Sequence, residues 1–245
     1  MSDFLFRGSI ADLDPNVDDL INLEAERQFK KALSLNPLIL QSRIWYSLFL
    51  LAHTLKNYDK GIEQSKIAIE NDPLSAYAFA CYALVLASAN KNQEAIEASK
   101  TAVELEEDAM LSRFTLSYCY LCSGELEKAL QIGLLAVESS NRHAWNLILV
   151  LVIYKELNQM EEALKIYQEI EVRYQDHNLP PSFLAIASAV IGNDKEALEL
   201  AHIAVAVFDP YMTYLGINFK TSEAIHNIDG FDQIIKQLGF SNLNK

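Results

Sequence analysis

Cys119 and Cys122 have the spacing of a metal or redox motif, so they are the first residues to consider for chemistry. Residues three positions apart share one face of a helix. A zinc site needs two further ligands, and the sequence offers neither a second Cys pair nor a neighbouring His pair. A redox C-x-x-C pair belongs at a helix N-terminus, whereas this one falls late in an expected helix. We therefore expect Cys119, Cys122 and Cys81 to be buried structural thiols, and we predict no metal site.

The histidines and acidic runs do not have the spacing of a catalytic site either. No two histidines form H-x-x-x-H or H-E-x-x-H, and a catalytic base needs a nucleophile and an orienting partner. The acidic runs 104–108 and 161–162 fall at helix ends and are interpreted as solvated. No Gly-rich phosphate loop is present. We predict a protein that is not an enzyme and has no cofactor. The histidines are His53, His143, His177, His202 and His226.

The composition narrows the class of protein. The 245 residues are 51% hydrophobic and 22% charged, which is too apolar for disorder and too charged for a membrane protein. A net charge of −13 argues against binding to nucleic acid and to anionic lipid. Three cysteines cannot all pair, which fits a reduced compartment. We expect a cytoplasmic protein that binds neither nucleic acid nor a membrane.

A phrase built on small residues recurs along the chain with a nearly constant period. Each copy starts at a small lead residue, with a small or aromatic residue four positions later and Ala, or Ile in the fifth copy, seven positions later. The successive intervals are 36, 34, 34, 34 and 34 residues. Small side chains let two antiparallel helices approach closely, and one pair cannot cover its own apolar face, so pairs stack. The lead residues are Ala25, Gly61, Ala95, Ala129, Ala163 and Ala197.

The period of 34 and the phrase Trp45-x2-Leu48-Phe49-x2-Ala52 resemble the tetratricopeptide repeat (TPR) family. The resemblance covers about residues 23–209 and implies an all-α fold, a right-handed helix-turn-helix solenoid of one half and five full repeats. Within an array of residues 20–210, the helix pairs are expected at 42–73, 76–107, 110–141, 144–173 and 178–209.

The two ends of the chain depart from the repeat. Residues 1–19 contain Pro15 and five Asp, and we expect them to be irregular. Pro210 ends the array, and residues 211–245 are expected to form a capping segment with short helices at about 222–227 and 230–238. The apolar residues of that segment, among them Phe219, are expected to pack on the last repeat.

The tail also resembles a more specific group. Its phrase Gly230-Phe231-x-x-Ile234-Ile235 and the phrase Asn71-Asp72-Pro73 are similar to those of the C-terminal TPR half of bacterial signalling and transcriptional regulators. In that group the array follows a cyclase, a kinase or a winged-helix domain. The resemblance implies a bacterial protein and, as one alternative, a detached regulatory or oligomerisation module of such a regulator.

In TPR stacks the first helix of each pair lines the concave side, and the repeat register then gives the inward positions. These are mainly apolar or aromatic, unlike the Lys, Asn and Arg of the groove that clamps a chaperone's C-terminal carboxylate. We predict a groove for an apolar peptide or helix. The candidate groove residues are Arg43, Tyr46, Leu50, Tyr77, Phe114, Tyr118, Leu121, Trp145, Ile148 and Lys155.

These observations predict a non-catalytic scaffold or adaptor whose partner is a protein or a peptide. Exposed aromatic and aliphatic stripes are typical of partner sites, and grooves of this kind receive amphipathic helices or extended segments. Two other uses of the groove stay open at this point. The chain itself, for example its N-terminal segment, fills the groove, or the groove joins two copies in a homodimer.

Overall fold

The structure is a computed structural model that describes residues 15–212, 217 and 219–237, with side chains from Asn22 onward. The described part is helical and contains no strand. The helices are α1 (Pro15–Leu35), α2 (Leu40–Trp45), the π-helix η2 (Tyr46–Thr54), α3 (Tyr58–Asn71), α4 (Ala76–Ser88), α5 (Asn92–Leu105), α6 (Met110–Ser123), α7 (Leu126–Ser139), α8 (Ala144–Glu156), α9 (Met160–Gln175), α10 (Pro181–Ile191), α11 (Asp194–Ala206), α13 (Glu223–His226) and α14 (Phe231–Gln237).

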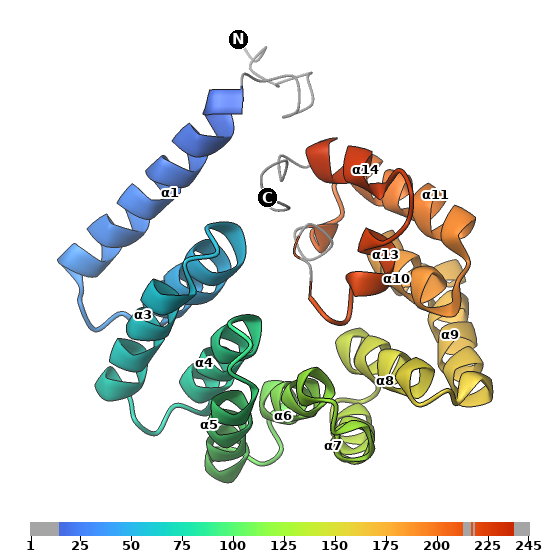
Figure 1. The fold of residues 1–245 in the computed structure, drawn as a ribbon, viewed down its shortest axis with the longest axis horizontal. Coiled ribbons are helices and arrows are strands. Elements are labelled where there is room, and N and C mark those ends of the chain that lie inside the picture. Colours follow the sequence, from blue (N-terminus) through green and yellow to red (C-terminus); the bar gives the residue numbers. More distant parts are fainter. Residues whose placement is uncertain (1–14, 213–216, 218, 238–245) are drawn as a thin grey trace.

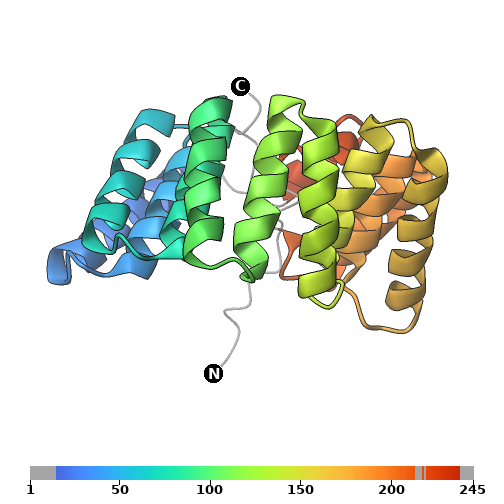
Figure 2. The ribbon, with the colours of Figure 1, turned by 90° about the horizontal axis from the view of Figure 1, so that it is seen from below.

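Successive helix pairs curve into an open ring (Figure 1). The first helices of the pairs, such as α4, α6 and α8, line the inside of the ring, and the second helices, such as α5 and α7, lie on the outside. Seen from below, the helices stand side by side in one band (Figure 2). The expected all-α solenoid is confirmed by this arrangement. None of its described helices is long and apolar enough to cross a bilayer.

The recurrent small residues lie where helices approach most closely. Ala95, Ala129 and Ala163 are fully buried. At Gly133 the approach is closer still, because a Cβ atom there would lie 3.0 Å from both the Ser117 Oγ and the Val150 Cγ2. Small side chains therefore set the spacing between the helix pairs, and the bulkier apolar residues of the first helices fill the core between them.

The turns between the two helices of each pair repeat as regularly as the helices. The residues at positions 56, 90, 124, 158 and 192, spaced by 34, all have positive φ. Four of them are Gly or Asn, the residues that adopt the left-handed conformation at least cost. Lys56, at φ 50°, is the fifth. One left-handed residue at the same turn position therefore ends each of these first helices and reverses the chain.

The first full repeat contains a π-helix that its counterparts lack. In this repeat the two helices start 18 positions apart, at Leu40 and at Tyr58. In the second full repeat they start 16 positions apart, at Ala76 and at Asn92. The Leu55 N–H donates to the Leu50 carbonyl at 2.8 Å, a bond that spans five residues instead of four. The π-helix thus takes up extra residues, which also accounts for the longer first sequence interval. It turns the side chains of η2 relative to those of the other first helices.

The N-terminal boundary differs from the sequence-based expectation. Helix α1 begins at Pro15, so residues 15–19, which were expected to be irregular, are helical. Proline is well suited to the first helical position, because its missing N–H has no partner there and its φ is already helical. Residues 1–14 lie outside the described part of the chain.

In the C-terminal segment, two short helices pack against the last repeat. Helix α13 contacts α10, and α14 contacts α11. Ile225 and Phe231 are almost fully buried there. The expected cap residues Leu238 and Phe240 lie outside the described residues. The described residues directly before α13, however, lie inside the ring (Figure 1).

Candidate functional site

An apolar cavity of about 260 Å³ opens on the concave face. Its walls come from four successive first helices, η2, α4, α6 and α8, and from the segment that precedes α13. The repeat places these helices next to one another on the inner side of the ring. The lining residues are Leu48, Phe49, Tyr77, Cys81, Leu84, Met110, Leu111, Phe114, Tyr118, Trp145, Phe219 and Thr221.

Aromatic rings dominate this cavity, and their contacts fix their positions. Phe114 and Tyr118, one helical turn apart on α6, stack with ring centroids 6.2 Å apart and 11° between the planes. The Trp145 indole meets the edge of Phe183 at 5.0 Å. Tyr77 is about one third exposed, and its hydroxyl accepts from the Trp45 indole N–H at 3.4 Å. These rings form a preorganised apolar surface.

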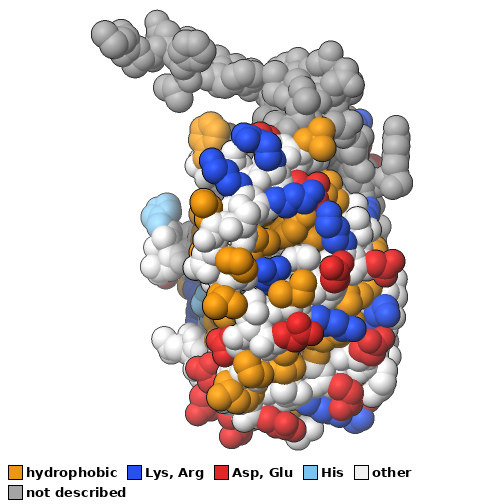
Figure 3. Space-filling model, turned by 90° about the vertical axis from the view of Figure 1, so that its left-hand side faces the viewer, with side chains coloured by type: hydrophobic (Ala, Val, Ile, Leu, Met, Phe, Trp, Pro, Cys, Tyr) orange, Lys and Arg blue, Asp and Glu red, His pale blue; other side chains and the backbone are white. Residues whose placement is uncertain are grey.

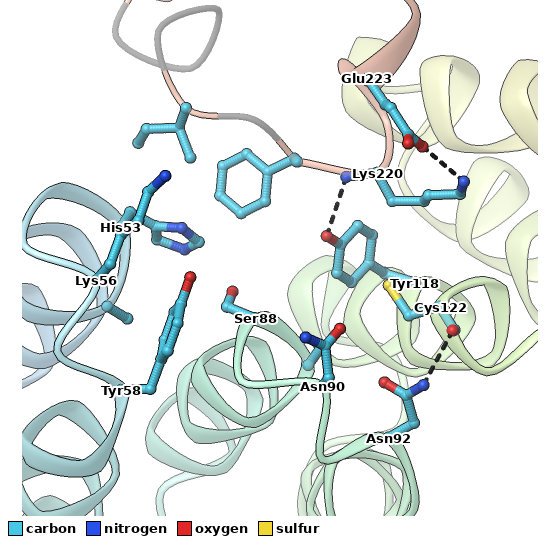
Figure 4. A pocket seen from close by; sticks show the side chains of 14 residues that line it. His53, Lys56, Tyr58, Ser88, Asn90, Asn92, Tyr118, Cys122, Lys220 and Glu223 are labelled. Atoms are coloured by element: carbon cyan, nitrogen blue, oxygen red, sulfur yellow. Dashed lines mark hydrogen bonds and ion pairs between the residues drawn. The ribbon is translucent and has the colours of Figure 1, made fainter. Parts of the chain in front are cut away.

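A second cavity, of about 420 Å³, adjoins the first and is polar (Figure 4). Side chains of η2, of the start of α3 and of the turn after α4 point into it, among them those of His53, Tyr58 and Asn90. The Asn92 amide donates to the Cys122 carbonyl at 3.1 Å and closes one wall. The Lys220 ammonium and the Glu223 carboxylate, 2.6 Å apart, pair at the rim. The concave face therefore offers an apolar and a polar compartment.

His53 is a buried titratable side chain in the wall of this polar cavity. Its exposed fraction is 9%, and burial lowers its pKa from 6.5 to about 4. The imidazole is therefore neutral at pH 7. Its Nε2 atom has no hydrogen-bond partner among the described residues. The Phe219 ring lies against it, with centroids 4.5 Å apart.

Residues 219–221 cross the concave face, and we call them the strap. Phe219 contacts His53 of η2 and also meets the edge of the Tyr118 ring at 6.2 Å, with 83° between the planes. The Lys220 N–H donates to the Tyr118 hydroxyl at 3.3 Å (Figure 4). The expectation that Phe219 packs on the last repeat is wrong, because its ring reaches the first and third full repeats.

The candidate residues from the sequence divide into three groups. Tyr77, Phe114, Tyr118 and Trp145 come together in the apolar cavity. The second group lies against neighbouring elements: the Tyr46 ring stacks on Phe29 of α1, and Leu50 joins the same cluster. The rest of the candidates do not line the apolar cavity. The Arg43 guanidinium donates to Gln64 and to the Pro37 carbonyl, and Leu121 and Ile148 lie in the core. Lys155 donates to the Val190 carbonyl and lines a separate pocket beside Lys220 and Thr221.

The π-helix explains why three candidates miss the cavity. A register carried over by 34 positions from α4 selects Arg43, Tyr46, Leu50 and His53. Of these, His53 lies on the concave side, and the extra residues of η2 bring Phe49 there in place of the other three. The first repeat interval, 36 residues instead of 34, was the feature of the sequence that indicated this shift of register. Nothing in the sequence indicated that Phe219 belongs to the site, because it lies in a segment outside the repeats.

Cys81 and Cys122 lie in the walls of the two cavities, and Cys119 lies in the core. Burial raises the pKa of the Cys81 and Cys119 thiols to about 12, and that of Cys122 to about 11. All three are therefore protonated at pH 7 and weak nucleophiles. In the part of the chain that the structure describes, no group of His, Cys, Asp or Glu has the arrangement of a metal site.

Comparison with known proteins identifies the fold. No family model matches the sequence, and no curated protein matches it. A TPR protein of Parabacteroides merdae ATCC 43184 superposes with a TM-score of 0.61 at 14% identity, over 93% of this chain and 82% of that chain. A thermophilic TPR protein of Thermus thermophilus gives 0.57 at 19% identity, over 76% of this chain and 99% of that chain.

A third similar structure is a chain of the Cut9–Hcn1 hetero-tetramer of the APC/C. Its TM-score is 0.56 at 13% identity, over 90% of this chain and 43% of that chain. At these identities the likeness concerns the fold alone. The chain has the TPR fold, and its site must be judged on its own residues.

Proposed function

We propose that this chain is a non-catalytic protein-interaction scaffold that binds an apolar segment of a partner protein on its concave face. The observation that carries the proposal is the cavity lined by Tyr77, Phe114 and Trp145 on three successive first helices. Aromatic clusters of this kind are typical anchor sites at protein interfaces. That a similar TPR chain is part of a hetero-tetramer supports a role in assembly.

The size and chemistry of the cavity define what it accepts. About 260 Å³ is below the roughly 300–1,000 Å³ of sites for drug-sized molecules. It suits one or two large side chains that project from a peptide. With a net charge of −13, the chain attracts a basic partner and accelerates its association. The proposed partner segment is therefore apolar or aromatic with basic residues around it.

The test is a selection of random peptides displayed on phage against the purified chain, followed by affinity measurements with Phe114→Glu. A carboxylate in the apolar cavity is expected to weaken binding by about 30-fold or more, the factor that corresponds to about 2 kcal/mol at an interface anchor. Leu135→Glu is the matched control, because Leu135 lies on the outer helix α7 and is 43% exposed. Equal affinities of both variants for every selected peptide would contradict the proposal.

A second candidate function is a regulatory or oligomerisation module of a signalling regulator. It is favoured by the similarity of the tail to such regulators and by the strap, which links the tail to the concave face. If the chain has this function, we expect two copies of it to associate through the groove. Light scattering at increasing protein concentration would then show a dimer that Phe114→Glu reduces to a monomer, whereas a constant monomer mass excludes it.

A further inference from the structure

The strap separates the two cavities of the concave face. Phe219 and Tyr118 are the residues common to both linings. The Phe219 ring lies between the imidazole of His53 and the edge of Tyr118. It fills an aromatic subsite at the centre of the groove, between the apolar compartment and the polar one.

The contacts of the strap are of a kind that another chain can reproduce. One is a backbone N–H, that of Lys220, which donates to the Tyr118 hydroxyl at a long 3.3 Å. Another is the aromatic ring of Phe219, and Thr221 of the strap is buried as well. The Lys220 ammonium pairs with Glu223, which belongs to the same C-terminal segment. Among the described residues, the salt bridge of Lys220 therefore lies within its own segment, and Glu156 of α8 attracts its charge without a direct ion pair.

The strap also leaves one polar group of the groove unused. His53 Nε2 is buried beside Phe219 without a hydrogen-bond partner among the described residues. A phenylalanine ring has no polar atom that could bond to this nitrogen. With Phe219 in place, the fold is therefore destabilised by an unsatisfied buried polar group. An occupant with both a ring and a hydrogen-bonding group removes that cost.

We propose that the strap is a built-in competitor, and that a partner segment carrying a tyrosine takes the place of the Phe219 ring between His53 and Tyr118. This inference rests on the proposed function and names the residue that the groove recognises. A neutral imidazole has one donor and one acceptor nitrogen, and a phenol hydroxyl both donates and accepts, so tyrosine pairs with either tautomer. Once the ring is displaced, the two cavities form one channel for an extended segment.

The experiment compares three full-length chains: the parent, Phe219→Ala and the control Phe208→Ala. Phe208 lies after α11 with 91% of its side chain exposed, so the same substitution there leaves the groove untouched. Peptides are selected from a random phage library on the parent and on Phe219→Ala, and their dissociation constants are measured by fluorescence anisotropy. Circular dichroism melting curves establish that each variant is folded.

The expected result is that selected peptides contain tyrosine and bind Phe219→Ala at least about tenfold more tightly than the parent or Phe208→Ala, because the competitor is gone. Tyr118→Phe is a milder second variant, which removes the hydroxyl that accepts the strap N–H and that also interacts with Cys122. It is expected to raise the affinity roughly 2- to 10-fold, as for the loss of one neutral hydrogen bond.

If Phe219→Ala binds the selected peptides with the same affinity as the parent or more weakly, the proposal that the strap competes with the partner is wrong. The proposed function still stands in that case, provided that Phe114→Glu abolishes binding. Peptides that bind all chains, Phe114→Glu included, with one affinity overturn the proposed function itself. A selection that enriches no peptide on either chain overturns both.

Discussion

His53 illustrates at the residue scale how the concave face combines apolar burial with an unused polar group. Its imidazole is almost fully enclosed between Phe219 and the wall of η2. Burial disfavours the charged form, which is why its pKa falls to about 4. The same feature that makes the site specific therefore makes the stability of the fold sensitive to acid.

The free energy of unfolding is expected to fall between pH 7 and pH 5. In the window between about 4 and 6.5 the unfolded histidine binds a proton that the folded one does not, so stability decreases as the pH falls. The size of this shift corresponds to a loss of about 2 kcal/mol over that step. Urea unfolding at both pH values measures it, with His53→Gln as the comparison. An unchanged pH dependence in His53→Gln would show that other groups cause it.

At the element scale, the sequence predicted the helix pairs well and the register of η2 poorly. Period, small residues and turn signals are local, so they located α4 through α11 closely. The π-helix depends on how extra residues are accommodated inside a helix, and a pattern transferred from other repeats carries no information on that. Phe49, which lines the concave cavity, was consequently missed, whereas Tyr46 and Leu50 were selected although they pack against α1.

Helix α1 is the end of the array and docks through a small cluster. Phe29 and Leu33 cover Tyr46 and Leu50 of η2, and the Lys60 ammonium bonds to the Glu26 carboxylate at 2.7 Å. Side chains on this end of the molecule mix apolar and charged types (Figure 3). Because repeats contact only their neighbours, an end element opens without the rest.

Phe29→Ala is expected to loosen α1 while the central repeats stay intact. Loss of a half-buried phenylalanine at a cost of about 2 kcal/mol would speed amide hydrogen exchange of α1 roughly 30-fold. Exchange measured by mass spectrometry resolves α1 from α6 to α8. Leu35→Ala is the control, since Leu35 is 79% exposed. Faster exchange across the whole array would mean that α1 does not open independently.

At the scale of the whole molecule, the curved solenoid brings together residues that no local pattern connects. The hydrogen bond between Lys220 and Tyr118 joins positions 102 apart. The sequence predicted that apolar tail residues need a covering surface, and α13 and α14 do pack on the last repeat. Only the curvature of the whole array shows that the chain before α13 lies against the first and third full repeats.

The central claim is that partners bind inside the ring, and photo-crosslinking tests it most directly. p-Benzoylphenylalanine replaces Phe114 in one chain and Leu135, on the outer helix α7, in another, and each is irradiated with a biotinylated peptide selected on the parent chain. The account predicts a covalent adduct at position 114 and none at position 135. An adduct at position 135 with none at position 114 would place the partner on the convex surface and contradict the account.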